Sequence, residues 1–305
     1  MIADGFGVTA APSPVAGTPA DDSWQLGQAG TWRSFARHRA ALVALVVLVL
    51  VVLTSLLAPL LELPAPNLVN LLVPLRGPSW GHLLGTDQLG RDELARILAA
   101  TRISLWAALL ATVTGVIIGV PLGLLTGFRG GRIMDSVISR TFDCLQSIPA
   151  LILAIAIVAA LGRQLTYAMI AVGIAFSPTF YRVSRAAAVT VASESYIEAS
   201  RSMGQRTAKI VTTHVLGNVS APLIALTSTT FAFGILAEAA LSYLGLGVQP
   251  PQASLGTMLS TAADLLNSSP QLTIEPGLMI MLLVLCISVI ADALGDVTSG
   301  HGSPR

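Results

Sequence analysis

Long stretches without charged side chains divide this chain of 305 residues. A helix needs about 20 mostly apolar residues to cross the hydrocarbon core of a membrane, which is about 30 Å thick. Six stretches approach or exceed that length, and Glu238 interrupts one of them without ending it. The pattern predicts an all-α integral membrane protein with six transmembrane helices, at 38–61, 102–127, 145–162, 165–182, 219–243 and 275–295.

Composition agrees with this fold class. Hydrophobic residues make up 53% of the chain and charged residues 11%, whereas soluble domains carry about 25% charged residues. The net charge of +1 argues against a nucleic-acid binder. Cys144 and Cys286 lie too far apart to suggest a disulfide framework or a metal site, and none is predicted.

Basic residues predict the orientation. They gather before the first helix and in the second and fourth connections, whereas segment 244–274 has neither Lys nor Arg. Cytoplasmic loops carry the excess of Lys and Arg, so both termini should be cytoplasmic, with the first helix retained as an anchor. The organisation expected is a flexible cytoplasmic tail (1–31), a first helix with an outer segment (32–101), a five-helix core (102–295) containing a cytoplasmic loop (183–218), and a tail (296–305).

The second predicted helix carries four glycines at intervals of four residues: Gly115, Gly119, Gly123 and Gly127. Small residues at this spacing form one helix face on which another backbone approaches closely. That face serves packing within the chain, a surface for a second membrane subunit, or a seam along which helices move.

The cytoplasmic loop predicts two short helices. Ser195 and Glu198 have the spacing of a capping box, Tyr196, Ala199 and Met203 share one helical face, and Gly204 follows where a left-handed cap would stand. Two readings are open: a helix lying on lipid headgroups, or a knob offered to a cytosolic partner, with Ala199 and Ser200 small enough for close approach.

This loop resembles the "EAA" loop of permeases of ATP-binding-cassette (ABC) importers. Five positions match the family pattern, and His214 also matches a position of the family loop. Two positions differ: Ser200 replaces the second Ala of the pattern, and Gly217 replaces its Pro. The matching residues are Glu198, Ala199, Gly204, Ile210 and Leu216. The resemblance implies the type I ABC-importer permease fold and a coupling helix, formed by Tyr196 and these residues, that docks on an ATPase.

Two further motifs narrow the resemblance. Residues 84–92 read LGTDQLGRD and lead into 100–105, ATRISL, and residues 242–251 read SYLGLGVQPP. Both are similar to the C-type permease of dipeptide and oligopeptide importers. Leu255 and 290–292 depart from that pattern.

The resemblance also implies the cofactors and partners. The chain has no G-x-x-x-x-G-K-[ST] motif, so it is expected not to be an enzyme; ATP and Mg would be used by one or two cytosolic ABC ATPase subunits. A homologous B-type permease would complete the pathway, and an extracytoplasmic solute-binding protein would deliver di- or oligopeptides. The location implied is the bacterial inner membrane, in contact with lipid and without nucleic acid.

Other functions stay open. The ligand could be nickel or another small molecule. An ion-coupled secondary transporter would place ionisable residues within the membrane, where Glu238 is either a pathway carboxylate or a hydrogen-bonded structural group. Apolar residues at helical spacing over 255–266 predict a short outer helix, covering the mouth of a pathway or lying in the lipid interface.

Overall fold

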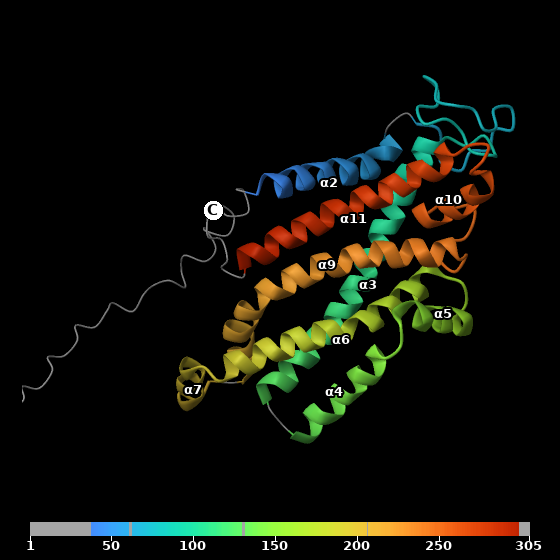
Figure 1. The fold of residues 1–305 in the computed structure, drawn as a ribbon. Coiled ribbons are helices and arrows are strands. Elements are labelled where there is room, and N and C mark those ends of the chain that lie inside the picture. Colours follow the sequence, from blue (N-terminus) through green and yellow to red (C-terminus); the bar gives the residue numbers. More distant parts are fainter. Residues whose placement is uncertain (1–37, 61–62, 130–131, 206, 299–305) are drawn as a thin grey trace, which may run out of the picture.

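A computed structural model describes residues 38–60, 63–129, 132–205 and 207–298 (Figure 1). The described part is helical and contains no β-strand, which confirms the all-α class. The elements in chain order are α2 (Arg39–Leu57), η2 (Ala58–Leu60), α3 (Glu93–Arg129), α4 (Arg132–Gln146), α5 (Ala150–Leu161), α6 (Leu165–Ala192), α7 (Ser195–Ser202), α8 (Thr207–Ile210), η3 (Val211–Val215), α9 (Leu216–Tyr243), α10 (Leu255–Ala262), η4 (Ala263–Leu265) and α11 (Gln271–Thr298).

Six membrane-spanning helices are not confirmed. Within the described ranges, four helical stretches are long and apolar enough to cross a membrane: Arg39–Leu60, Glu93–Phe128, Pro222–Tyr243 and Gln271–Asp296. The pair α4 and α5 makes a fifth if it counts as one broken span. The predicted tail 1–31 lies outside the described residues.

The predicted span 145–162 is wrong in its limits, because a break lies inside it. Helices α4 and α5 meet at an angle of 88°, and between them stand Ser147, Ile148 and Pro149. A residue before proline is disfavoured in the helical conformation, and proline donates no backbone hydrogen bond. The helix therefore stops before Pro149 and restarts after it.

Helix α6 has the length of a span but a more polar sequence. Its 28 residues include Ser177, Pro178, Tyr181 and Arg182. Twelve of its residues are buried inside the molecule, where it contacts α3, α5 and α9. Protein side chains cover much of its surface, so α6 needs fewer apolar residues than a helix that faces lipid all round.

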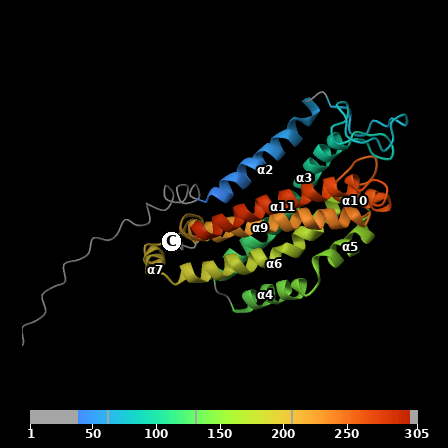
Figure 2. The same ribbon diagram turned by 45° about the horizontal axis from the view of Figure 1, so that its top comes forward.

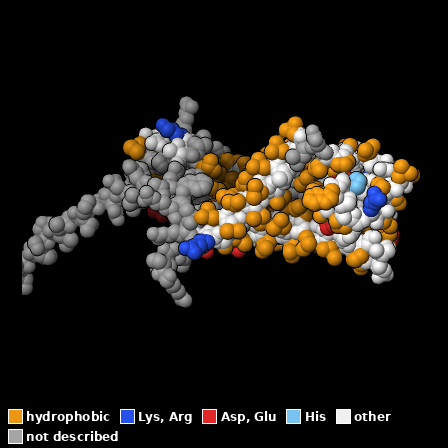
Figure 3. Space-filling view, turned by 90° about the horizontal axis from the view of Figure 1, so that it is seen from above, with side chains coloured by type: hydrophobic (Ala, Val, Ile, Leu, Met, Phe, Trp, Pro, Cys, Tyr) orange, Lys and Arg blue, Asp and Glu red, His pale blue; other side chains and the backbone are white. Residues whose placement is uncertain are grey.

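The long helices lie roughly side by side, and α3 crosses them (Figures 1 and 2). One end of the molecule carries α7, the start of α2 and the end of α11. The other end carries α5, α10 and segment 63–92. Seen from above, hydrophobic side chains cover the middle of the molecule, and Lys and Arg side chains appear near its ends (Figure 3). This distribution is that of a protein with a belt of lipid around it.

The glycine face of α3 packs against α6 of the same chain. A Cβ added at Gly119 would lie 2.6 Å from the Cβ of Phe180 and 2.9 Å from the backbone nitrogen of Tyr181. At Gly123 it would lie 2.5 Å from the carbonyl oxygen of Tyr181. Gly115 and Gly127 face α6 in the same way. Of the three readings of this face, the arrangement is that of packing within the chain.

Candidate functional site

The predicted cytoplasmic loop forms a small helical knob at one end of the molecule, where α7 projects beyond the long helices (Figure 1). Two apolar side chains anchor it. Ile197 on α7 and Ile210 on α8 are fully buried, in a cluster with Phe128 at the end of α3 and Phe180 of α6. The knob is therefore fixed to the core and does not hang from flexible connections.

The outward side of the knob is exposed. Met203 is 71% exposed and Tyr196 is 42% exposed, and Glu198 and Leu216 are also open to the surface. Ser200 is buried, and its hydroxyl donates to the Tyr196 carbonyl oxygen over 2.9 Å. Ser200 therefore lies on the inner side of α7 and not on the face that exposes Tyr196 and Met203. The side chains of Ala199 and His214 lie outside what the structure describes.

The two ends of α7 differ in how well the sequence predicted them. Gly204 has the predicted left-handed conformation, with φ of +76°, and the amide of Gln205 closes the helix on the Ser200 carbonyl oxygen over 3.2 Å. The capping box does not form among the described contacts. The amides of Ile197 and Glu198 donate to the Glu194 carbonyl oxygen, so the helix starts one residue earlier and Ser195 already lies inside its first turn.

Glu238 is a residue of α9, and its side chain lies deep in the protein beside α3 and the segment before α10. It is completely buried, and it accepts hydrogen bonds of 2.6 Å from the Ser104 hydroxyl and 2.7 Å from the Ser242 hydroxyl. Ser242 in turn accepts from the Val248 amide over 3.3 Å. Both carboxylate oxygens are used inside the chain, which is the geometry of the structural reading rather than of a group open to a pathway.

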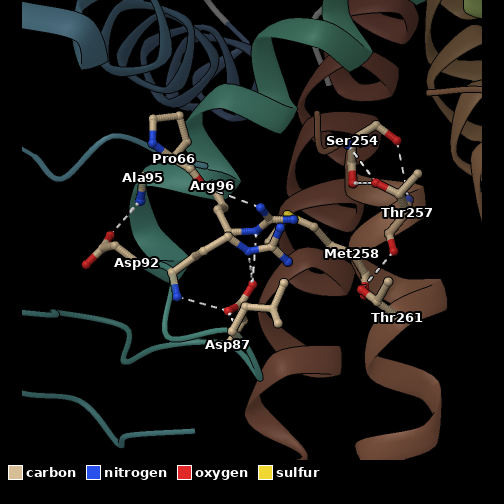
Figure 4. A network of polar contacts seen from close by, with 11 residues as sticks. Pro66, Asp87, Asp92, Ala95, Arg96, Ser254, Thr257, Met258 and Thr261 are labelled. Carbon is tan, nitrogen blue, oxygen red and sulfur yellow. Dashed lines mark hydrogen bonds and ion pairs between the residues drawn. The ribbon is translucent and has the colours of Figure 1, made fainter. Parts of the chain in front are cut away.

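The motif at 84–92 folds into a polar knot at the far end of α3. Asp87 accepts from the amides of Leu89 and Arg91 over 2.8 and 3.0 Å, and it pairs with Arg91 over 2.6 Å and with Arg96 over 3.5 Å (Figure 4). Asp92 accepts from the Ala95 amide over 2.8 Å and so caps α3. The knot fixes where α3 begins.

His82 belongs to the same knot, with its Nδ1 2.8 Å from a carboxylate oxygen of Asp92. The spacing of ten positions between His82 and Asp92 did not predict this contact. Across the described residues, no group of three or more His, Cys, Asp or Glu side chains could hold a metal ion.

The outer helix predicted within 255–266 is present as α10 and η4. Ser254 caps it in a capping box with Thr257. Leu255, Met258 and Ala262 are buried on its inner face, against a cluster that includes Ile235 of α9 and Leu283 of α11. This packing joins α10 to the core at the end opposite to the knob.

A family model for the "binding-protein-dependent transport system inner membrane component" matches residues 119–299, which include the knob and the helices on either side of it. The chain belongs to this family of inner-membrane permeases. A second model, for the N-terminal transmembrane domain of oligopeptide transport permease C, matches residues 28–74.

Several relatives align with this chain over most of its length and of their own. The dipeptide transport system permease protein DppC of Alkalihalophilus pseudofirmus is 37% identical, over 93% of this chain and 94% of its own. The di/tripeptide transport system permease protein DppC of Pseudomonas aeruginosa is 40% identical, over 87% and 89%. A glutathione transport system permease protein GsiD of Pectobacterium atrosepticum is 37% identical, over 87% and 88%.

Solved structures share the permease fold. A chain of the inward-facing MetNI methionine ABC transporter aligns with a TM-score of 0.55 and 19% identity, over 67% of this chain and 97% of that one. A second crystal form of it gives a TM-score of 0.54. The chain is thus an ABC-importer permease, and the ion-coupled secondary transporter is set aside.

Proposed function

We propose that this permease carries di- and oligopeptides across the bacterial inner membrane as one half of an ABC importer, and that the knob around α7 receives the push of a cytosolic ATPase. The peptide substrate rests on the names of the relatives that cover nearly the whole chain. The other half would be a homologous B-type permease, with a solute-binding protein supplying the ligand.

The observation that carries the docking role is that one side of the knob is buried in the protein core and the other side is exposed. Ile197 and Ile210 fix it in the core, while Tyr196, Glu198 and Met203 are left on the surface. The buried Ile197 points into the protein core, so packing against the protein holds α7 in place without insertion into the bilayer. A surface held rigidly from behind transmits a movement instead of absorbing it.

The proposed orientation places the knob, both termini and the ATPase in the cytoplasm. Helix α2 begins and α11 ends at the end of the molecule where α7 lies, in agreement with the charge asymmetry. ATP and Mg would be bound by the partner subunits and not by this chain.

The test is a substitution on the exposed face of the knob. Met203→Glu should leave the membrane level of this chain unchanged, lower the amount of ATPase that co-purifies with it, and abolish uptake of a labelled dipeptide. Ser193→Glu introduces the same side chain at an exposed position just before α7 and serves as the control.

Retained ATPase and normal uptake in Met203→Glu would show that the knob is not the docking site. The substrate is tested separately, by competition of unlabelled dipeptides, longer peptides and nickel for uptake by the unaltered complex. Competition by nickel alone would replace the peptide assignment without affecting the docking assignment.

A further inference from the structure

A groove runs between α2, α3 and α9. Its middle is a cavity of about 370 Å³ lined almost entirely by apolar side chains, including Leu48, Val52 and Leu105. A second cavity of about 440 Å³ shares Leu48, Leu109 and Phe231 with the first and continues it toward α11. Leu56, Trp106 and Leu109 on its sides are exposed, so the groove opens to the surface. It is a long apolar trough.

One end of the trough is polar. Arg102 of α3 and Ser55 of α2 line the first cavity and also a neighbouring cavity of about 410 Å³, beside Ala58, Pro59 and Pro66. The Ser55 side chain is almost fully buried, and its Oγ has no hydrogen-bond partner among the described residues. Arg102 is exposed, and among the residues that the structure describes its side chain forms neither an ion pair nor a hydrogen bond. A cation and an unused hydroxyl therefore share one site.

The depth of this site matches a membrane boundary. Ser55 lies close to the end of the apolar stretch Arg39–Leu60. Trp106, one turn from Arg102 along α3, is 65% exposed, and tryptophan is enriched where membrane meets water. From Arg102 to Val113 the helix rises by about 16 Å, which is close to half of the roughly 30 Å hydrocarbon core. The apolar trough thus follows one leaflet from its boundary toward the middle.

We propose that this groove binds a phospholipid of the bilayer, with its phosphate held by Arg102 and Ser55 and an acyl chain lying along Leu48, Leu109 and Phe231. Arginine and a hydroxyl are both donors that suit phosphate oxygens, and an exposed Arg among apolar side chains calls for an anion. A phospholipid supplies that anion and the apolar chain in one molecule at the required depth. The site goes beyond the proposed function, and its test does not rely on transport.

A helix of a second protein chain is the competing occupant. It would need an acidic side chain opposite Arg102 and would meet a trough whose lining offers few polar groups to pair with. A phospholipid needs no acidic side chain and no polar partners along the trough. Its phosphate would lie beside Arg102, and its acyl chain would continue from there along the apolar side chains.

The experiment uses the complex purified through this chain and reconstituted into phosphatidylcholine nanodiscs that contain phosphatidylglycerol with a diazirine on one acyl chain. After illumination, lipid adducts are located by mass spectrometry. Adducts at the trough residues Leu48, Leu109 and Phe231 should exceed those at Ile152 on α5 and Met281 on α11, which are exposed and line neither cavity of the trough. Arg102→Gln should lower the trough adducts roughly tenfold, as expected for one lost charge-assisted hydrogen bond.

A second trough variant and three controls make the result specific. Arg163→Gln removes an exposed arginine elsewhere and should leave the trough adducts unchanged. Val52→Trp fills the trough and should lower them even if Arg102→Gln fails to fold, whereas Val46→Trp on the exposed side of α2 should not. Diazirine-labelled diacylglycerol, which has no phosphate, should label the trough weakly.

The proposal is overturned by equal labelling of the trough and of Ile152 and Met281, unaffected by Arg102→Gln, because this means unspecific lipid contact. It is also overturned by diacylglycerol labelling as strong as that of phosphatidylglycerol. Adducts that join the trough to another protein chain would assign the groove to that chain instead.

Discussion

Gly204 stands at the turn where the knob reverses direction. Its φ of +76° is a left-handed conformation, but the position of a Cβ there is open, with no atom within 4 Å. A side chain would therefore meet backbone strain and no clash, at a cost of about 1–2 kcal/mol for most residues. Asn tolerates this conformation better than a β-branched residue does.

We expect Gly204→Asn to keep most dipeptide uptake and Gly204→Val to lose it, with equal membrane levels by immunoblotting. The two variants differ in backbone preference at the same exposed site. Equal uptake by both would mean that the turn at Gly204 does not control the coupling surface.

A second residue-scale prediction concerns Glu238, which accepts from Ser104 and Ser242 in the buried core. Glu238→Leu leaves two buried hydroxyls without their acceptor, at about 1–3 kcal/mol each. Glu238→Gln keeps the size and one acceptor oxygen. The purified leucine variant should melt at a lower temperature than the glutamine variant, as measured by thermal unfolding in detergent. The reverse order would contradict a structural role.

The sequence predicted some of these residues well and others poorly, for a physical reason. Gly204 followed from local helix-end geometry, which depends on a few neighbouring residues. The burial of Glu238 depends on Ser104, which is 134 positions away, so the sequence left its two readings open. The inward side of Ser200 depends on the packing of α7 on α3 and α6, which no local pattern records.

At the scale of elements, the seam between α3 and α6 is the tightest part of the molecule. Gly119→Ala would bring a methyl group against the backbone of α6, and overpacking of this kind costs about 1–3 kcal/mol. We expect a lower melting temperature and less protein in the membrane. Gly217→Ala on α9 is the matched control, because nothing lies within 4 Å of its Cβ and alanine favours helix.

Helix α4 is held to α6 through polar contacts. Asp135 pairs with Arg185 at 2.6 Å, with side chains 23% and 36% exposed, whereas the pair Asp143 and Arg182 at 2.6 Å is 60% and 53% exposed. Exchanging the charges, with Asp135→Arg and Arg185→Asp together, should restore the stability lost in each single variant. A double-mutant cycle should give a coupling of about 1 kcal/mol for this pair and a smaller value for the exposed pair. Equal couplings would argue against a role for burial.

The break between α4 and α5 marks where sequence reasoning failed at this scale. The span 145–162 was predicted from the length of a stretch without charged residues. That length contains no information about the change of helix direction at Pro149. Helix α4 was not expected at all, because its apolar side chains, such as Ile133 and Val137, are exposed and its polar ones face α6. That reversed pattern makes sense in a bilayer.

At the scale of the whole molecule, the number of crossings decides where the ends lie. An even number places both termini on one side, and an odd number separates them. A reporter fused after Arg305 should indicate the cytoplasm, and one inserted at Ser260 in α10 should indicate the outside. A cytoplasmic signal at Ser260 would refute the proposed orientation, and opposite signals from reporters at the two termini would leave five crossings.

The rigid attachment of α7 has a mechanical consequence. Its buried Ile197 shares a cluster with the end of α3, and α3 is a single helix of 37 residues, about 55 Å long, that is fused to α6 along its glycine face. Because α6 packs against Gly119 and Gly123 on either side of Pro121, we expect a push on the end of α3 to tilt the helix rather than to bend it. If α3 tilts, a displacement of a few ångströms at the knob should produce a displacement of similar size at its other end. That end carries the polar knot around Asp87, on the opposite side of the bilayer.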